Sequence, residues 1–320
     1  MRGYQTKVRI FAAMVALVLL SGCAATPMTT QLTASPPLGM STTFELNDVP
    51  FFAQTVNHCG PAALATVLNS SGLKTTPEYL ATSIYTPGRD GTLQTEIITG
   101  ARRQARLALP VRSLDVALDH ITQGRPVLIL QNLGLDIAPF WHYAVIIGFD
   151  IPNETLLLRS GTTRRQTMAM QTFEHTWRRA DYWGVVMVKP AGPIPQKTEI
   201  SEWLNEAYGL ERAGQELAAL TAYSTAAQHW PGAATPLIFS ANILIRKERL
   251  LDATIDLRAA VQRDPINPSA RNNLAHVLML QGMLGEAEAH AQKAVEYGAG
   301  MQDTATQTLS AIRQKKAEQR

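Results

Sequence analysis

From residue 201 onward the chain repeats every 34 residues, and this period is the strongest constraint on how its second half folds. The residues that recur in register are small or aliphatic. The four sets are Ala207, Ala241 and Ala275; Leu210, Leu244 and Leu278; Ala219, Ala253 and Ala287; and Ala226, Ala260 and Ala294. Small side chains let the two helices of a hairpin approach closely, and Pro231 and Pro265 stand where the second helix of a unit would end. The pattern predicts an all-α solenoid of helical hairpins.

The period and the residue types resemble the tetratricopeptide repeat, in three copies over residues 201–300. Residues 191–200 are expected to be a linker, and residues 301–320 a capping helix with a tail. Three units are about the minimum for a stable stack of this kind. The resemblance implies a concave face that binds an extended peptide or a protein partner. The alternative is that the repeats only pack on the first domain or set its distance from a membrane.

The N-terminus has the pattern of an export signal. Arg2, Lys7 and Arg9 are followed by an apolar run from Ile10 to Leu20. This run is too short to cross a bilayer as a helix, which needs roughly 20 residues, but it has the length of a signal-peptide core. Residues 1–22 are therefore predicted to be a signal peptide.

The four residues Leu20-Ser21-Gly22-Cys23 end that segment and resemble the bacterial lipobox. The resemblance implies that Cys23 receives a diacylglyceryl group, that cleavage leaves it as the new N-terminus, and that the lipid anchors the chain to a membrane. Because Ala24 rather than Asp follows the cysteine, the resemblance points to the cell envelope, on the periplasmic side of the outer membrane. The alternative is an ordinary secretory signal with a chance cysteine.

The distribution of charge excludes one class of function. The net charge of +3 equals the charge of the three basic residues in the export signal, so the rest of the chain is neutral. A neutral chain has no general basic face for nucleic acid, and no nucleic-acid partner is expected. Residues 23–44 carry no charge and are rich in Thr, Ser, Pro and Ala, so they are expected to form a flexible tether.

The segment around Cys59 contains the first candidate catalytic residues. Pro61 fits the first turn of a helix, and the apolar residues after it predict a buried helix with Cys59 at its N-terminus. Free N–H groups and the helix dipole at that end favour the thiolate over the thiol. Gln54, five residues upstream, can direct its side-chain amide toward the same point and stabilise an oxyanion.

A thiolate nucleophile also needs a base. Of the seven histidines, His142 is the best placed, near the start of an alternating apolar run over residues 140–150 that predicts a strand. Residues 126–131 predict another buried strand before it. His58 adjoins Cys59, but neighbouring side chains at a helix start diverge. A cysteine on an early helix and a histidine on a later strand is the arrangement of papain-type thiol enzymes.

Gln54, the segment Cys59-Gly60-Pro61-Ala62-Ala63-Leu64 and the segment beginning His142-Tyr143-Ala144-Val145 resemble, in this order, the double-glycine (bacteriocin-leader) peptidase family of papain-like cysteine peptidases. The resemblance implies an α+β papain-like domain over residues 45–190. It implies that Cys59 is the nucleophile, His142 the general base and acid, and Gln54 the oxyanion-hole donor. More narrowly, the chain resembles bacterial lipoproteins that join such a domain to tetratricopeptide repeats.

One position departs from the family pattern. The family has an Asp on the strand after the histidine, which orients the imidazole, whereas Ser160 stands at about that place in this chain. A serine can accept a hydrogen bond from a ring N–H but has no charge to stabilise the imidazolium. Asp150 is too close along the chain to replace it easily, and Asp136 precedes the histidine in a loop. We therefore expect a slower enzyme or a different third partner.

These observations together predict an exported, lipid-anchored cysteine peptidase with a papain-like α+β domain and an all-α repeat domain. Its substrate is expected to be a peptide or protein. No metal or organic cofactor is indicated, because the sequence contains no metal-spaced His/Cys cluster and no glycine-rich phosphate loop. Two alternatives keep the fold. One is a thiol acyltransferase or cell-wall amide hydrolase, and the other is a catalytically inactive scaffold that acts through its repeats.

Overall fold

The computed structural model describes residues 25–53, 59–85, 88, 91–298 and 300–319. Two residues with a predicted function, Cys23 and Gln54, lie outside the described residues. Contacts divide the chain into two compact units. The first comprises Met1–Ser70 and Val111–Val185, and the second comprises Ser71–Pro110 and Val186–Arg320. The domain boundaries expected at residues 45, 190 and 200 stay predictions.

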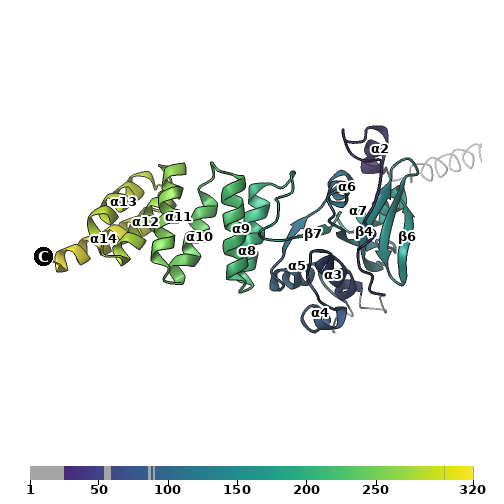
Figure 1. The fold of residues 1–320 in the computed structure, drawn as a ribbon, viewed down its shortest axis with the longest axis horizontal. Coiled ribbons are helices and arrows are strands. Elements are labelled where there is room, and N and C mark those ends of the chain that lie inside the picture. Colours follow the sequence, from purple (N-terminus) through teal and green to yellow (C-terminus); the bar gives the residue numbers. More distant parts are fainter. Residues whose placement is uncertain (1–24, 54–58, 86–87, 89–90, 299, 320) are drawn as a thin grey trace, which may run out of the picture. The chain divides into compact units, whose positions relative to one another are not determined.

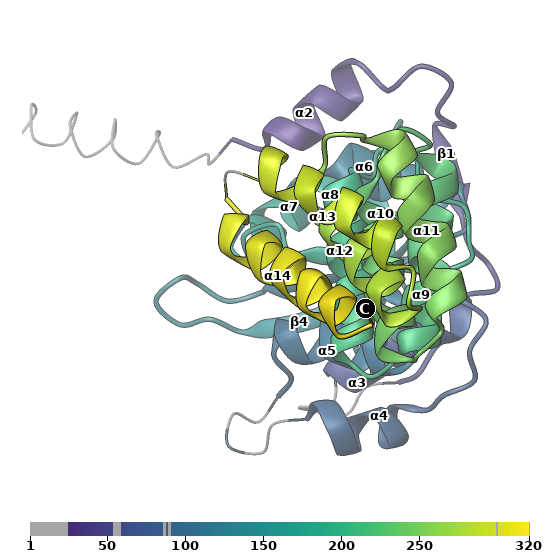
Figure 2. The same cartoon turned by 90° about the vertical axis from the view of Figure 1, so that its left-hand side faces the viewer.

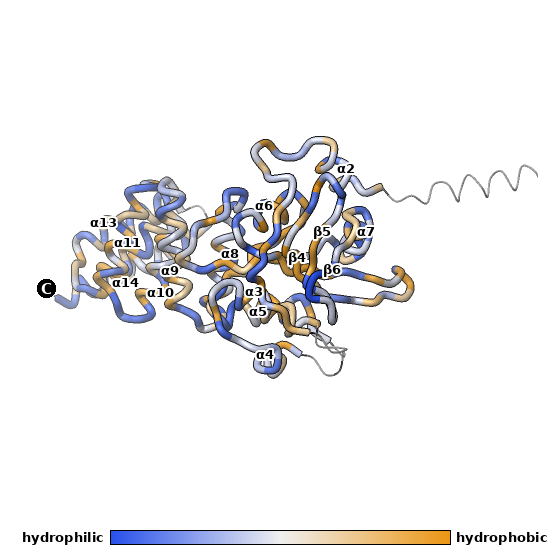
Figure 3. The backbone as a smooth tube through the Cα atoms, turned by 45° about the vertical axis from the view of Figure 1, so that its right-hand side comes forward, coloured by the Kyte–Doolittle hydropathy of each residue, from blue (hydrophilic) through white to orange (hydrophobic). Residues whose placement is uncertain are grey.

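A largely antiparallel sheet forms the centre of the first unit. Its strands are β1 (Thr43–Glu45), β3 (Val127–Asn132), β4 (Trp141–Asp150), β5 (Thr155–Ser160), β6 (Thr163–Ala169) and the start of β7 (Gly184–Val188). Their order is β7-β3-β4-β5-β6, and β1 pairs with the end of β4. Strands β3 and β4 are buried along nearly their whole length, whereas β6 is mostly exposed and hydrophilic (Figure 3). The two buried strands are the ones that the apolar runs predict.

Four helices are described in the first unit. They are α2 (Pro27–Ala34), α3 (Cys59–Ser70), α6 (Leu114–Thr122) and α7 (Met170–Arg178). Three of them pack on this sheet, and the first, α2, packs on α6 and α7. Helices α3 and α6 contact β3 and β4, and α7 contacts β3, β5 and β6. Every residue of α3 from Gly60 to Leu68 is buried. This apolar packing fixes the start of α3 relative to the strand that carries His142.

The segment expected to be a flexible tether, residues 23–44, instead contains the helix α2. The carboxylate of Glu174 accepts hydrogen bonds from Met28 N (3.0 Å), Thr29 N (2.7 Å) and Thr29 Oγ1 (2.6 Å). It thereby caps the positive end of the helix, and Leu32 is buried in the same unit. The tether prediction is wrong for these residues because it considered local composition only. The cap comes from a residue 145 positions away.

The second unit is mostly helical. It begins with α4 (Pro77–Ile84), α5 (Gln94–Arg103) and β2 (Leu107–Pro110), which lies beside the last residues of β7. The later helices are α8 (Ile200–Arg212), α9 (Glu216–His229), α10 (Thr235–Arg246), α11 (Leu250–Arg263), α12 (Pro268–Leu280), α13 (Leu284–Tyr297) and α14 (Gln302–Glu318). They follow one another in a row (Figure 1), which Figure 2 views from its C-terminal end. The predicted fold class is confirmed: an α+β part precedes a helical repeat region. Within the described residues, no helix combines the length and hydropathy needed to span a membrane.

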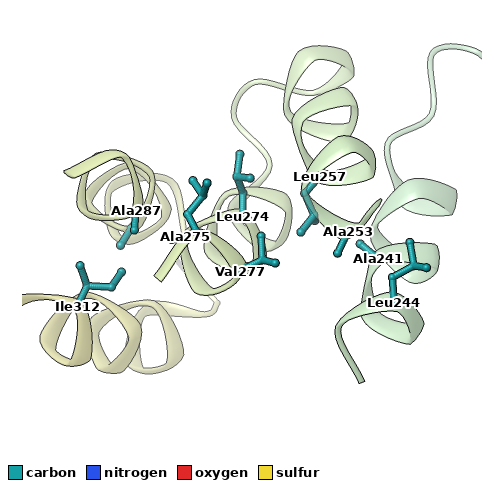
Figure 4. Packing of buried hydrophobic residues seen from close by; sticks show 11 residues of the cluster. Ala241, Leu244, Ala253, Leu257, Leu274, Ala275, Val277, Ala287 and Ile312 are labelled. Atoms are coloured by element: carbon teal, nitrogen blue, oxygen red, sulfur yellow. The ribbon is translucent and has the colours of Figure 1, made fainter. Parts of the chain in front are cut away.

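The 34-residue period corresponds to the spacing of the helices. Helices α9, α11 and α13 have 14 residues each and begin at Glu216, Leu250 and Leu284. All residues of the four small or aliphatic sets are buried. Side chains of α10 to α13 form one cluster, which Ile312 of α14 joins (Figure 4). The residues in register are therefore the contacts through which successive helices pack.

The turn between the two helices of each repeat needs a left-handed residue. Gly214 (φ 77°), Glu248 (φ 58°) and Gly282 (φ 79°) occupy this position in successive repeats, 34 residues apart. Each donates its backbone N–H to the carbonyl three residues earlier, at 3.0, 2.9 and 3.1 Å respectively. The middle repeat thus uses a residue with a Cβ where its neighbours use glycine, and such a residue is strained in this conformation.

We expect Glu248→Gly to raise the free energy of unfolding by about 1 kcal/mol, because glycine adopts positive φ without steric cost. Urea-induced unfolding measures the change. Gly214→Ala is the matched control and should lower stability by a similar amount through backbone strain, since nothing lies within 4 Å of the added Cβ. A Glu248→Gly protein that is less stable than the wild type would contradict this interpretation of the turn.

A buried ion pair links α8 to the helix and strand at the start of the second unit. Glu206 accepts hydrogen bonds from Arg102 Nη2 (2.6 Å), Arg102 Nε (3.2 Å) and Ala108 N (3.0 Å). The Glu206 side chain is only 9% exposed. Arg102 reaches it by crossing Gly209, where a Cβ would overlap the guanidinium group. Gly209 is therefore required by the ion pair and not by the helix.

Gly209→Ala should consequently destabilise the protein by about 2 kcal/mol, because it displaces Arg102 and leaves a buried carboxylate without its partner. In an ordinary helix the same change stabilises by about 0.5–1 kcal/mol. Gly285→Ala, in a helix position where the Cβ meets nothing within 4 Å, is the control that should show no loss. If both variants unfold at the same urea concentration as the wild type or at a higher one, the predicted loss of stability in Gly209→Ala is wrong.

Candidate active site

Cys59 is the first residue of α3, as the sequence predicts. It is half-buried, whereas the residues that follow it up to Leu68 are buried, so the thiol is the accessible end of a buried helix. Pro61 lies within the first turn, where its missing N–H removes no helical hydrogen bond. The N–H groups of this turn have no partner within the helix and carry its positive partial charge. This environment can stabilise an oxyanion at the same point.

The thiol lies close to the start of β4. Helix α3 packs against β4, and burial, with a smaller contribution from the nearby Cys59, raises the pKa of Tyr143. Tyr143 is the residue next to His142, and its ring makes an edge contact with Trp183 at 5.8 Å between centroids. The structure therefore brings the candidate nucleophile to the end of the strand that carries the candidate base.

His142 and Ser160 are in direct contact. His142 Nε2 lies 2.9 Å from Ser160 Oγ, across the neighbouring strands β4 and β5. On its other side, His142 is paired in register with Gln131 of β3. Within the described part of the chain, no hydrogen bond joins Cys59 to His142. Such contacts are often long in a free enzyme and shorten when substrate binds.

The surroundings of His142 determine its charge. The ring is half-buried, and burial lowers the pKa of His142 below its ordinary value. Ser160 supplies a hydrogen bond but no negative charge that would oppose this effect. The imidazole is therefore neutral at pH 7 and able to accept a proton from a thiol.

Two aspartates, Asp150 and Asp136, could replace the missing acid. The first is hydrogen-bonded to another residue, and the second lies in a loop. The carboxylate of Asp150 accepts hydrogen bonds from Asn153 N (3.0 Å) and Asn153 Nδ2 (2.8 Å) in the turn after β4. Asp136 is exposed in the loop between β3 and β4. Of the three candidates for orienting His142, Ser160 is the one that contacts the ring.

Arg159 is a residue near the site that the sequence analysis missed. Its guanidinium is buried and donates to the carbonyl of Val49 from Nη2 (2.9 Å) and Nε (3.3 Å). Val49 begins the segment that leads to Cys59, and Arg159 directly precedes Ser160. One buried side chain thus ties this segment to the strand that holds Ser160. The sequence signal for this role was a single arginine at the end of the apolar run over residues 156–158.

No metal centre accompanies these residues in the described part of the chain, where no group of His, Cys, Asp and Glu side chains has the arrangement to hold a metal ion. An open hollow over β1, β4, β5 and β6 is lined by Phe44, Glu45, Asn47 and Arg165 among others. It contains none of Cys59, His142 and Ser160, and we assign it no part in the chemistry.

Comparisons with known proteins bear on both parts of the chain. Residues 46–185 match the Peptidase_C39 like family. Among solved structures, a C39-like peptidase from Bacillus anthracis is 19% identical, with a TM-score of 0.41, and the match covers 46% of this chain and 98% of that chain. No curated protein matches the chain significantly.

Two of the similar solved structures are tetratricopeptide repeat or secretion-chaperone proteins. The first repeat domain of Spaghetti (RPAP3), bound to an HSP90 peptide, is 18% identical, with a TM-score of 0.35 and coverage of 37% of this chain and 93% of that one. The Yersinia enterocolitica type III secretion chaperone SycD, in complex with a peptide of the translocator YopD, is 16% identical, with a TM-score of 0.35 and coverage of 38% and 98%.

Proposed function

We propose that the C39-like peptidase domain of residues 46–185 hydrolyses peptide bonds with Cys59 as the nucleophile. The observation that carries this proposal is the placement of Cys59 at the accessible end of the buried helix α3, packed against the strand on which His142 contacts Ser160. A thiol at a helix N-terminus and a neutral, hydrogen-bonded imidazole at the facing strand are the two groups that thiol acyl transfer requires.

In the proposed reaction, His142 takes the thiol proton as the Cys59 sulfur attacks the carbonyl carbon of the substrate amide. The N–H groups of the first turn of α3, together with the predicted donor Gln54, stabilise the oxyanion. The C–N bond then breaks, and the amine leaves with the proton from His142. Water attacks the resulting thioester while His142 accepts a proton from it. The carboxylic acid is released, and the thiol of Cys59 is regenerated.

Export and lipid attachment at Cys23 are part of the proposal. They rest on the lipobox-like residues and the short apolar run before them. The mature chain would then be held at the periplasmic side of the outer membrane. The helical repeats would bind an extended peptide of a partner or substrate protein, as the two repeat relatives do with the peptides in their structures.

The test of the activity is the appearance of new termini in a peptide mixture incubated with the full chain and analysed by mass spectrometry. The expected products have free carboxylates, and they are absent with Cys59→Ala. Products that carry an added amine would instead identify a thiol acyltransferase. A cell-wall preparation is incubated in parallel, and its cleavage without cleavage of the peptides would identify an amide hydrolase on the same fold.

A second candidate function is a non-enzymatic scaffold that acts through its repeats. The uncharged Ser160 beside His142 favours it, because no carboxylate stabilises the imidazolium there. This function predicts that Cys59→Ala retains the biological role of the protein, while loss of residues 200–320 abolishes it.

A further inference from the structure

The loop between β3 and β4, which leads into the candidate site, exposes a group of large apolar side chains. Leu133, Leu135, Ile137, Phe140 and Trp141, here called the apolar tip, are between 40% and 92% exposed. The hairpin that carries them projects from the first unit, at the left of Figure 2, and is orange at its end in Figure 3. So many large apolar side chains exposed together on one short segment are unusual in a soluble surface and mark an interaction site.

The hairpin is ordered by its own hydrogen bonds. The Asn132 side chain, which is buried, accepts from Gly134 N (3.0 Å) and Phe140 N (2.9 Å). Leu135 and Ala138 exchange backbone hydrogen bonds of 3.2 and 3.1 Å across the turn. The chain passes so close to itself that a Cβ at Gly134 would clash with Phe140 N. The apolar side chains are therefore presented on a fixed support.

The shape of the apolar tip suits insertion into a lipid bilayer and does not suit a pocket that binds a peptide. A site that recognises a peptide side chain is concave and covers most of its ligand. Ile137, at 92% exposure, has almost no protein beside it and cannot form a pocket wall. A protruding group of leucine, isoleucine, phenylalanine and tryptophan is instead the composition that enters the interface of a lipid bilayer.

The hairpin and the beginning of the described chain are held by consecutive arginines. Arg179 donates to the backbone carbonyl of Asn132 from Nη2 (2.9 Å) and Nε (3.1 Å), at the base of the hairpin. Arg178 donates to the carbonyl of Ala25 at 3.4 Å. Cys23 stands two positions before Ala25 in the sequence, a reach of about 7 Å. With α2 capped by Glu174, the lipid would be held near this end of α7 and not on a long tether.

We propose that the apolar tip inserts into the surface of the lipid bilayer to which Cys23 is anchored. This inference rests on the lipid attachment proposed above. Lipid and hairpin together would give two points of attachment, one covalent and one by insertion of side chains. Arg178 and Arg179, both half-exposed, can pair with anionic headgroups, and Asp136 would remain at headgroup level. Two attachments would restrict how the peptidase domain turns and keep its candidate site at the membrane surface.

The test uses the full lipidated chain in vesicles of phosphatidylethanolamine and phosphatidylglycerol, with and without lipids brominated in their acyl chains. Bromine quenches tryptophan fluorescence on contact. We expect quenching in the wild type, and its loss in Trp141→Phe and in Leu135→Glu/Ile137→Glu by at least about half, since acidic residues disfavour insertion. Leu251→Glu, at an equally exposed leucine in α11, is the matched control and should quench as the wild type does.

Equal quenching in the wild type and in Trp141→Phe would overturn the proposal. So would a Leu135→Glu/Ile137→Glu protein that is quenched normally but has a raised KM for peptides in detergent, because the tip would then bind substrate. The mass of the N-terminal proteolytic fragment shows separately whether Cys23 carries the lipid. If the chain carries no lipid and Trp141 is still quenched, the proposed lipid anchor is refuted and the insertion of the hairpin is retained. The fragment mass and the fluorescence quenching are both independent of catalysis.

Discussion

Replacing Cys59 with alanine should lower kcat/KM for peptide hydrolysis by about 10⁴-fold or more, because it removes the proposed nucleophile that forms the acyl-enzyme. The fold should persist, since the thiol is at the exposed end of α3 and the apolar residues from Gly60 onward hold the helix. Initial rates of peptide cleavage at several substrate concentrations measure the effect. Unfolding in urea checks that the variant remains folded.

Ser70→Ala is the matched control for this variant. Ser70 lies at the other end of the same helix, and its hydroxyl donates to the carbonyl of Thr66 at 3.0 Å. Its loss should leave kcat/KM unchanged. If Cys59→Ala cleaves peptides at the wild-type rate, Cys59 is not the nucleophile, and the activity belongs to another group or to a contaminant.

Replacing His142 with alanine should lower kcat by about 10³-fold, the range in which general acid–base catalysis contributes. The variant would lose the proton acceptor for the thiol and the proton donor for the leaving amine in one step. His175→Ala, at a half-buried histidine in α7, is the control that should retain full activity. Comparable losses in both variants would mean that kcat falls for a structural reason.

The pH dependence of kcat/KM tests the role of His142 in a second way. Burial lowers the pKa of His142, so the neutral, proton-accepting ring persists to a pH below the ordinary histidine value of about 6.5. The acid limb of kcat/KM should accordingly lie below that pH in the wild type. Ser160→Asp places a negative charge at the atom that contacts the ring and should move the limb to higher pH. A limb that does not move would show that another group controls it.

The fold was predictable where a period or an uninterrupted apolar run carries the information. The residues in register, such as Ala241 and Ala275, mark helix contacts because small side chains are needed there in every repeat. Cys59 at the start of α3 and His142 near the start of β4 followed from Pro61 and from the alternating run. Ser160, chosen by position along the next strand, lies beside His142 in the structure.

Other features depend on residues that meet only after folding. Helix α2 forms in a segment of tether-like composition because Glu174, far along the chain, supplies its cap. The role of Gly209 depends on the path of Arg102, and that of Arg159 on the carbonyl of Val49. A pattern within one segment contains no record of such partners. The exposed apolar tip was equally hidden, because Phe140 and Trp141 read in sequence as the start of a buried strand and the other three residues as part of the loop before it.

The most direct test of a reactive thiol paired with His142 is the rate at which iodoacetamide alkylates Cys59 at pH 6.5, followed by mass spectrometry of its peptide in the lipidated chain. The chain has two cysteines, and the proposed lipid occupies the other one. We expect a rate at least about tenfold above that of a free cysteine, since His142 is proposed to take the proton of the attacking thiol. The rate should fall toward the free value in His142→Ala. A wild-type rate equal to that of free cysteine and unchanged by His142→Ala would contradict a catalytic Cys59.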